Sequence, residues 1–168
     1  MTILGIIPAR YASTRFPGKP LVDIAGKSMI QRVYEQAKKC VHLTEVTVAT
    51  DDTRIYDHVL GFGGSAVMTS SDHQSGTDRC AEVAQQHPQY NVIINIQGDE
   101  PFIDPDQITK LSFCFNDKAT QIATLVKKVV DEQELFNVNS PKVVINKLSE
   151  AVYFSRSPLP HIRGQEQQ

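Results

Sequence analysis

The sequence predicts an α/β fold whose central, mostly parallel sheet is flanked by helices, with a mixed or antiparallel extension toward the C-terminus. Short β-branched runs alternate with amphipathic helical patterns as far as Phe115, and this alternation is typical of parallel sheets. Beyond it, strand-like runs follow one another with little helix between them, which indicates antiparallel or mixed pairing. One domain over residues 1–168 is expected, because 40% hydrophobic content supplies a sizeable core.

The first expected elements enclose a long polar loop. A buried strand is predicted over residues 3–8, ending at Pro8 because proline cannot donate to a sheet ladder. A helix over residues 28–40 follows, with Ser28 as its N-cap and Gln31 as the capping-box partner. Loops of this length inside compact domains are usually functional, so the intervening segment is a candidate site.

The later elements follow from the same periodicities. Strands are expected at 45–50, 66–68 and 92–96, helices at 52–60, 77–86 and from Asp104-Pro105, and a final set of strands at 122–130, 141–146 and 151–154. In the helix from Asp104-Pro105, the buried face is expected to carry Ile108, Leu111 and Phe115. The polar tail from Gly164 is typical of a cut or frayed end.

Bulk properties exclude several classes of partner. A net charge of −2 gives no general attraction to nucleic acid or to an anionic membrane. No apolar run approaches the roughly 20 residues of a membrane span, and the N-terminus lacks the pattern of a signal peptide. Cys40, Cys80 and Cys114 are odd in number and lie in apolar contexts, which favours reduced core thiols. A cytoplasmic protein without nucleic-acid or membrane partners is therefore expected.

Three fixed cations lie in the loop that leaves the first strand. Arg10, Arg15 and Lys19 would converge at the carboxyl edge of the sheet, where open α/β folds bind ligands. From charge alone, three ordinary surface cations would be the better explanation. The long loop between strand and helix favours instead a site where the three cations bind a ligand with several negative charges. A nucleoside triphosphate is the foremost candidate.

A second candidate segment, Gln97-Gly98-Asp99-Glu100-Pro101, directly follows a hydrophobic strand. Its two carboxylates would reach the same sheet edge, and carboxylate oxygens together with substrate phosphates are the usual ligands of Mg²⁺. Gly98 would permit a close backbone approach or a positive φ. A plain turn is the alternative, but the position opposite the cationic loop favours a metal.

A third segment runs from Asp72 to Arg79 and joins a strand to a helix. Small residues at Ser75, Gly76 and Thr77 would present free amides at the helix start, as a cradle for an anion or a nucleobase. Helix capping by Ser75 or Thr77 explains the hydroxyls equally well. Arg79 is a further candidate for ligand binding, although a surface arginine is also possible.

Two other patterns are rejected. The glycines of residues 61–66 follow a helix and lead into a strand, the reverse of a dinucleotide fingerprint. Gly18-Lys19 resembles the end of a P-loop, but Ser13 replaces its first glycine and Pro20 its metal-binding hydroxyl. The histidines show no spacing typical of zinc ligands.

Residues 8–21, Pro-Ala-Arg-Tyr-Ala-Ser-Thr-Arg-Phe-Pro-Gly-Lys-Pro-Leu, closely resemble the signature of the 3-deoxy-manno-octulosonate (Kdo) cytidylyltransferase family, the CMP-Kdo synthetases. Segments 72–77, 97–101 and 153–157 resemble that family's other blocks in the same order. The resemblance implies a Rossmann-like nucleotidyltransferase fold. It also implies transfer of CMP from CTP to Kdo, with release of pyrophosphate, to make CMP-Kdo for lipopolysaccharide.

The resemblance also implies site roles. Arg10, Arg15 and Lys19 would hold the triphosphate and, with Asp99 as the Mg²⁺ ligand, would form the catalytic set. The expected nucleotide-binding residues, those three cations included, are completed by Pro8, Ala9, Ser13, Ser75, Gly76, Arg79, Gln97 and Gly98. Gln97 would lie near the sugar or the base.

Family members similar to this chain continue well beyond residue 168, so a truncated form is expected. A second metal-binding aspartate, much of the Kdo pocket and much of the interface of the family's homodimer would then lie in the absent part. Two alternatives stay open: another sugar-acid nucleotidyltransferase, such as a sialic acid enzyme, and a CTP-binding module without catalysis. Tyr11-Ala12-Ser13-Thr14 argues against the first, because sialic acid enzymes resemble a glycine-rich version of this loop.

Overall fold

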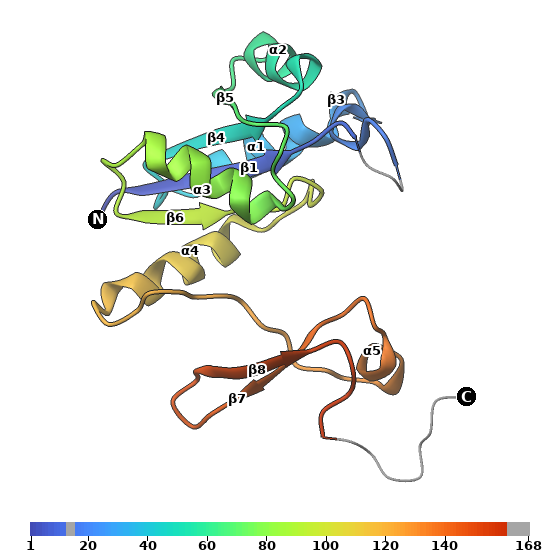
Figure 1. Ribbon diagram of the computed structural model, residues 1–168, viewed down its shortest axis with the longest axis vertical. Helices are drawn as coiled ribbons and strands as arrows, with labels where there is room; N and C mark the ends of the chain where they lie inside the picture. The colour runs from blue at the N-terminus through green and yellow to red at the C-terminus, as the bar shows by residue number, and fades with distance from the viewer. Residues whose placement is uncertain (13–15, 161–168) are drawn as a thin grey trace. The chain divides into compact units, whose positions relative to one another are not determined.

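The computed structural model describes residues 1–12 and 16–160 (Figure 1). The chain divides into two compact units, one over Met1–Ala123 and a second that begins at Thr124. Organisation as a single domain over 1–168 stays a prediction.

A parallel sheet forms the centre of the first unit, as the sequence predicts. Its described strands are β1 (Ile3–Ala9), β4 (Glu45–Thr50), β5 (Ala66–Met68) and β6 (Val92–Asn95), in the order β5-β4-β1-β6. The helices are α1 (Met29–Lys38), α2 (Thr53–Gly61), α3 (Gly76–Gln86) and α4 (Pro105–Phe113), with 3₁₀ turns η1 (Lys19–Leu21) and η2 (Cys114–Asn116). A two-residue hairpin that the sequence did not reveal, β2 (Asp23–Ile24) with β3 (Lys27–Ser28), precedes α1.

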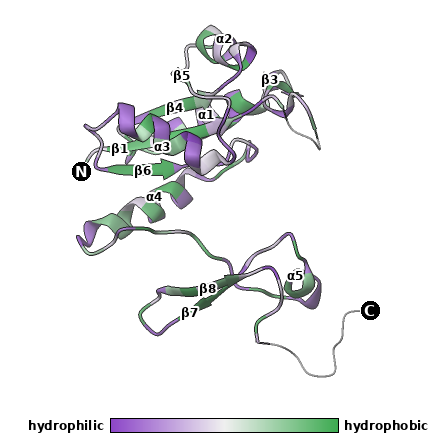
Figure 2. Ribbon diagram, in the orientation of Figure 1, coloured by the Kyte–Doolittle hydropathy of each residue, from purple (hydrophilic) through white to green (hydrophobic). Residues whose placement is uncertain are grey.

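Both faces of the sheet are covered, which explains why the central strand β1 is wholly apolar. Ile3 and Ile7 of β1 pack on one face against residues of α1, α2 and α4. Leu4 and Ile6 point to the other face, which α3 covers; in Figure 1, α3 lies in front of the sheet. Figure 2 shows the hydrophobic colouring along β4 and β6.

The expectation that Pro8 ends the first strand is wrong by one residue, because β1 continues to Ala9. Ile6 accepts a hydrogen bond from Ile96 on the β6 side, at an N···O distance of 2.9 Å. Alternate residues of a strand point their backbone groups to the same side, so Pro8 also faces the β6 side. Since β6 ends at Asn95, the missing N–H of Pro8 removes no ladder bond.

The expected helix caps are present, with one correction. Ser28 Oγ accepts from the Gln31 backbone N–H at 3.2 Å, as predicted. The reciprocal half of the capping box is absent, because the Gln31 side chain donates instead to Glu35 at 3.0 Å. The α1 helix ends at Lys38, short of the predicted Cys40. At α4, Asp104 caps and Pro105 occupies the first helical position, as expected.

The core also departs from prediction at one cysteine. Cys40 and Cys80 are buried free thiols, as expected, whereas Cys114 is exposed. Cys114 lies in η2, after α4 has ended, so the helical pattern that would have buried it no longer applies. In α4, Ile108 is buried and Leu111 is half-buried against the core, and Phe115, which lies in η2 beyond the end of α4, is half-buried as well.

The second unit contains α5 (Glu132–Phe136) and an antiparallel hairpin of β7 (Lys142–Ile145) and β8 (Ala151–Ser155). The antiparallel pairing confirms the predicted change of architecture. The strand expected over residues 122–130 is wrong, because this stretch pairs with no strand in the described chain. The α5 helix was missed, although Asp131 accepts from the Glu134 N–H at 2.7 Å and is a recognisable N-cap.

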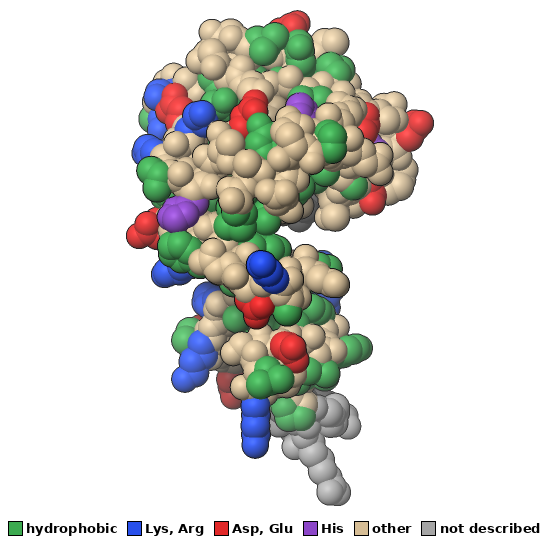
Figure 3. All heavy atoms as spheres, turned by 90° about the vertical axis from the view of Figure 1, so that its left-hand side faces the viewer, with side chains coloured by type: hydrophobic (Ala, Val, Ile, Leu, Met, Phe, Trp, Pro, Cys, Tyr) green, Lys and Arg blue, Asp and Glu red, His purple; other side chains and the backbone are tan. Residues whose placement is uncertain are grey.

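The surface carries no dominant sign of charge on the face seen in Figure 3, where acidic and basic side chains are interspersed. Among the helices of the described chain, none has the length and apolar character needed to cross a membrane.

Candidate nucleotide-binding site

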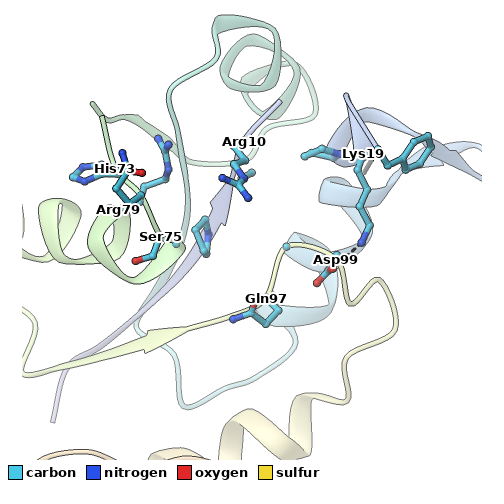
Figure 4. A pocket seen from close by; sticks show the side chains of 14 residues that line it. Arg10, Lys19, His73, Ser75, Arg79, Gln97 and Asp99 are labelled. Atoms are coloured by element: carbon cyan, nitrogen blue, oxygen red, sulfur yellow. Dashed lines mark hydrogen bonds and ion pairs between the residues drawn. The ribbon is translucent and has the colours of Figure 1, made fainter. Parts of the chain in front are cut away.

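A pocket of about 510 Å³ opens at the carboxyl edge of the sheet. Three segments form it: the loop after β1, the loop after β6, and the loop that leads into α3 (Figure 4). Its lining residues are Pro8, Ala9, Arg10, Phe16, Lys19, Pro20, His73, Gln74, Ser75, Gly76, Arg79, Gln97, Gly98 and Asp99. The chain runs from β1 outward to β4 and β5 and then returns to β6 on the other side of β1, so the pocket lies at a topological switch point.

The structure therefore brings together nearly all of the residues that the sequence nominated. Ser13 and Arg15 lie outside the described residues. The lining residues that sequence reasoning missed are Phe16, Pro20, His73 and Gln74. His73 and Gln74 lie within the candidate segment Asp72–Arg79, so their place in the sequence could have indicated that they line the pocket. No chemical property of Phe16 or Pro20 indicates that these residues line it.

Two glycines let the neighbouring loops close onto Pro8 at the end of β1. A Cβ placed on Gly98 would lie 2.8 Å from the Pro8 carbonyl oxygen, closer than Cβ atoms approach such an atom. A Cβ on Gly76 would lie 3.1 Å from Pro8 Cγ. Gly98 is therefore required for close approach and not for a positive φ, which settles the two possibilities that the sequence left open.

The loop after β1 carries Arg10 and Lys19 to the pocket. Gly18 takes the left-handed conformation (φ 72°) and donates from its backbone N–H to the Tyr11 carbonyl at 2.9 Å. This bond closes the loop, so that the residues on either side of it face the same cavity. Figure 4 shows Arg10 between Arg79 on one side and Lys19 on the other.

Lys19 and Asp99 form an ion pair across the pocket, with Nζ 2.7 Å from Oδ2 (Figure 4). Their side chains are 37% and 52% exposed, so water and salt screen the pair. Both groups are therefore available to a ligand that offers each a better partner.

Asp99 is the carboxylate that lines the pocket, and its neighbour Glu100 does not. Over the residues that the structure describes, no group of three or more His, Cys, Asp and Glu side chains could hold a metal by itself. Mg²⁺ is, however, commonly bound by one protein carboxylate together with the phosphate oxygens of a substrate. The donor set fits a metal that arrives with a nucleotide, and it does not fit a metal held by protein alone.

The start of α3 forms the wall opposite Asp99. Ser75 Oγ accepts from the Asp78 N–H at 3.1 Å and donates to Asp78 Oδ2 at 2.7 Å, so local capping uses this hydroxyl. The backbone of Gly76 and the positive end of the helix face the pocket, and both favour an anion there.

Arg79 lines the pocket although it is only 4% exposed. Its guanidinium donates to Thr69 Oγ1 and lies 3.3 Å from Asp51 Oδ2, and these two residues follow β5 and β4. Within the described chain, the other carboxylate oxygen of Asp51 is buried without a hydrogen bond. Arg79 thus ties α3 to the ends of two strands, a structural role that the sequence did not reveal.

His73 lies beside Arg79 on the same wall (Figure 4). Its Nε2 forms a hydrogen bond with Glu82 Oε2, which also accepts from the Ser70 N–H at 3.0 Å. The hydrogen bond with His73 is the largest cause that holds the pKa of Glu82 below its ordinary value. The loop into α3 is thereby attached to the body of that helix.

Comparison with known proteins agrees with this geometry. The model of the family described as cytidylyltransferase matches residues 4–168. A 3-deoxy-manno-octulosonate cytidylyltransferase of Parabacteroides distasonis is 61% identical, over 99% of this chain and 67% of its own length. One of the same name from Cytophaga hutchinsonii is 54% identical, over 97% of this chain and 65% of its own length.

A solved structure of CMP:2-keto-3-deoxy-manno-octonic acid synthetase complexed with CTP is similar over 100% of this chain and 69% of its own, with 45% identity and a TM-score of 0.90. The chain thus spans about two thirds of the length of the relatives it matches.

Proposed function

Because the chain belongs to the cytidylyltransferase family, among the 3-deoxy-manno-octulosonate cytidylyltransferases, we propose that it transfers CMP from CTP to Kdo and releases pyrophosphate. One observation carries the proposal: among the residues that the structure describes, the pocket at the carboxyl edge gathers Arg10, Lys19 and Arg79 around one lining carboxylate, Asp99. Asp51 neutralises Arg79 in the wall, so Arg10 and the exposed Lys19 are the cations that would attract an anionic ligand.

The pocket suits a nucleoside triphosphate in size and in charge. Its 510 Å³ lies within the roughly 300–1,000 Å³ typical of small-molecule sites. Arg10 and Lys19 come from the loop after β1, and the amide end of α3 faces them, so phosphates would be held from two sides. Arg15 is proposed to join this grip on the resemblance of its segment.

Asp99 would hold Mg²⁺ together with phosphate oxygens, and Lys19 would then turn from Asp99 to the phosphates. When bound, the ion would supply charge neutralisation on the departing pyrophosphate. Gln97, at the end of β6, would use its amide to orient the sugar or the base.

In the proposed reaction the anomeric hydroxyl oxygen of Kdo attacks the α-phosphorus of CTP. A bond forms between that oxygen and the α-phosphorus, the bond to the bridging oxygen of the β-phosphate breaks, and the hydroxyl proton is lost to solvent. Pyrophosphate leaves with the electron pair. Such transfers depend chiefly on positioning and charge stabilisation, which Arg10, Arg79 and Lys19 would provide.

The wider biological role follows from the family. The product CMP-Kdo would serve lipopolysaccharide biosynthesis, and a homodimer is the proposed state of the full-length protein. A cytoplasmic location stays a prediction of the sequence.

The test is pyrophosphate release by the chain with CTP, Mg²⁺ and Kdo, run beside the same assay with sialic acid. Calorimetric titration with CTP measures binding separately. Release with Kdo and not with sialic acid is expected. Binding of CTP without release would restrict the chain to nucleotide binding, and absence of CTP binding would overturn the site itself.

Asp99→Asn tests the metal role, with the adjacent Glu100→Gln as the matched control because Glu100 does not line the pocket. Asp99→Asn should lower kcat far more than it weakens CTP binding, whereas Glu100→Gln should leave both unchanged. Equal effects of the two variants would contradict a metal role for Asp99.

A further inference from the structure

The ring of Tyr11 lies between a cation and a glycine backbone beside the pocket. The guanidinium carbon of Arg54, on α2, is 3.4 Å from the centre of the Tyr11 ring. On Gly18, a Cβ would lie 3.1 Å from Tyr11 Cζ and 3.2 Å from Tyr11 Oη, so the glycine backbone also lies against this ring. The ring packs partly against the hydrophobic core as well.

Arg54 is itself held in place. Its Nε and one terminal nitrogen donate to the two carboxylate oxygens of Asp52 at 2.9 and 2.6 Å. Asp52 also caps α2 by accepting the Arg54 backbone N–H at 3.0 Å. Asp52 binds the edge of the Arg54 guanidinium through the two side-chain hydrogen bonds. The flat face of the guanidinium therefore remains free to cover the Tyr11 ring.

This stack anchors the loop that delivers the cations of the pocket. Tyr11 directly follows Arg10, Gly18 directly precedes Lys19, and the Gly18 N–H donates to the Tyr11 carbonyl at 2.9 Å. Both pocket cations are thus covalently next to residues of the stack. Neither Arg54 nor Tyr11 is among the lining residues, so their effect on a ligand would be indirect.

We propose that Arg54 and Tyr11 are positioning residues for CTP: their stack holds the Arg10 and Lys19 ends of the loop in the arrangement that receives the triphosphate. The proposal rests on the proposed function, because the triphosphate is its ligand. Without the stack, the loop would have to be ordered when the nucleotide binds, and that entropy would reduce affinity. Chemistry at saturating CTP would be unaffected.

The main test compares Arg54→Ala and wild type in steady-state kinetics. A cation–π contact of about 0.5–2 kcal/mol corresponds to a roughly two- to thirtyfold change in affinity. The expected result is a rise of that size in KM for CTP, with kcat and KM for Kdo unchanged. The side chain of Arg54 is 58% exposed on a helix, so alanine should not prevent folding.

Three further variants make the test specific. Tyr11→Phe keeps the ring and should retain the wild-type KM, whereas Tyr11→Leu should raise it. Arg54→Lys keeps the charge but not the planar fork, so it should remain impaired. Lys38→Ala, an exposed cation at the end of α1, is the charge-matched control and should be neutral.

A second measurement detects the stack without any nucleotide. The ring of Tyr11 should shift the NMR resonances of the Arg54 side chain upfield, and this shift should disappear in Tyr11→Leu. If the shift is present but Arg54→Ala leaves KM for CTP unchanged, the positioning role is wrong. If wild type binds no CTP while the shift is present, the proposed function is wrong although the stack exists. Absence of the shift in wild type would overturn the stack.

Discussion

Gly98→Ala should damage both the stability and the activity of the protein. The new Cβ would lie 2.8 Å from the Pro8 carbonyl oxygen and would have to retreat by roughly 0.6 Å to reach an ordinary contact of 3.4 Å. The obstructing atom belongs to the backbone of β1, so no side-chain rotation relieves the contact. Overpacking of this kind costs about 1–3 kcal/mol. Because Gln97 and Asp99 flank the substitution, they should move with it.

The effect on the reaction should exceed the effect on stability. A displacement of about 1 Å can lower an enzyme's rate by about 100-fold, so the smaller shift should reduce kcat/KM by roughly tenfold or more. Urea unfolding and the pyrophosphate assay measure the two effects.

Gly61→Ala is the control, because nothing lies within 4 Å of its added Cβ, at the end of α2. This variant should be neutral or more stable by up to about 1 kcal/mol. A Gly98→Ala protein as stable and active as Gly61→Ala would refute the close-approach argument.

Three other predictions concern stability and thiol chemistry. The hydrogen bond from His73 lowers the pKa of Glu82, so its stabilisation is complete above the ordinary pKa of about 4.3 and is lost as pH falls through the lower, folded value. The difference in urea midpoint between wild type and Glu82→Gln should therefore be largest near neutral pH and shrink on acidification. Burial raises the pKa of the Cys80 thiol to about 12, so iodoacetamide at neutral pH should label exposed Cys114 and spare Cys80 until the chain unfolds, as peptide mass spectrometry would show. Asp104→Ala should remove the cap of α4 and lower the unfolding free energy by about 1 kcal/mol, measured in urea.

The strands of the parallel sheet could be predicted because burial on two faces leaves a strong local signal, which the short hairpin of β2 and β3 lacks. The bounds of β4 and β5 agree with the sequence to the residue. The strand over 122–130 was wrong for the opposite reason. Its β-branched residues favour extended backbone, but a strand also needs a partner, and partner choice is not a local property.

The membership of the pocket could be predicted for a related reason. In a parallel sheet, the segments that follow the carboxyl ends of neighbouring strands lie close together, and this rule predicts that Arg10 and Asp99 line the same pocket, as they do. The partners of the charged side chains could not be predicted. That Arg79 binds Asp51 and Thr69 depends on three elements far apart in sequence, and that Arg54 covers Tyr11 depends on how α2 packs.

The pocket contains two kinds of ion pair, and their difference suggests how a triphosphate would be received. Arg79 is buried and pairs with the partly exposed Asp51, so separating the pair would leave the buried guanidinium charge without a partner, and the arginine is therefore fixed in the wall. Lys19 and Asp99 are exposed, and a pair of that kind is worth only about 0–1 kcal/mol. A ligand that brings both phosphates and a divalent ion offers each of them a stronger partner at little cost. The fixed pair would hold the shape of the site, while the exposed pair would open to admit the nucleotide and its metal together.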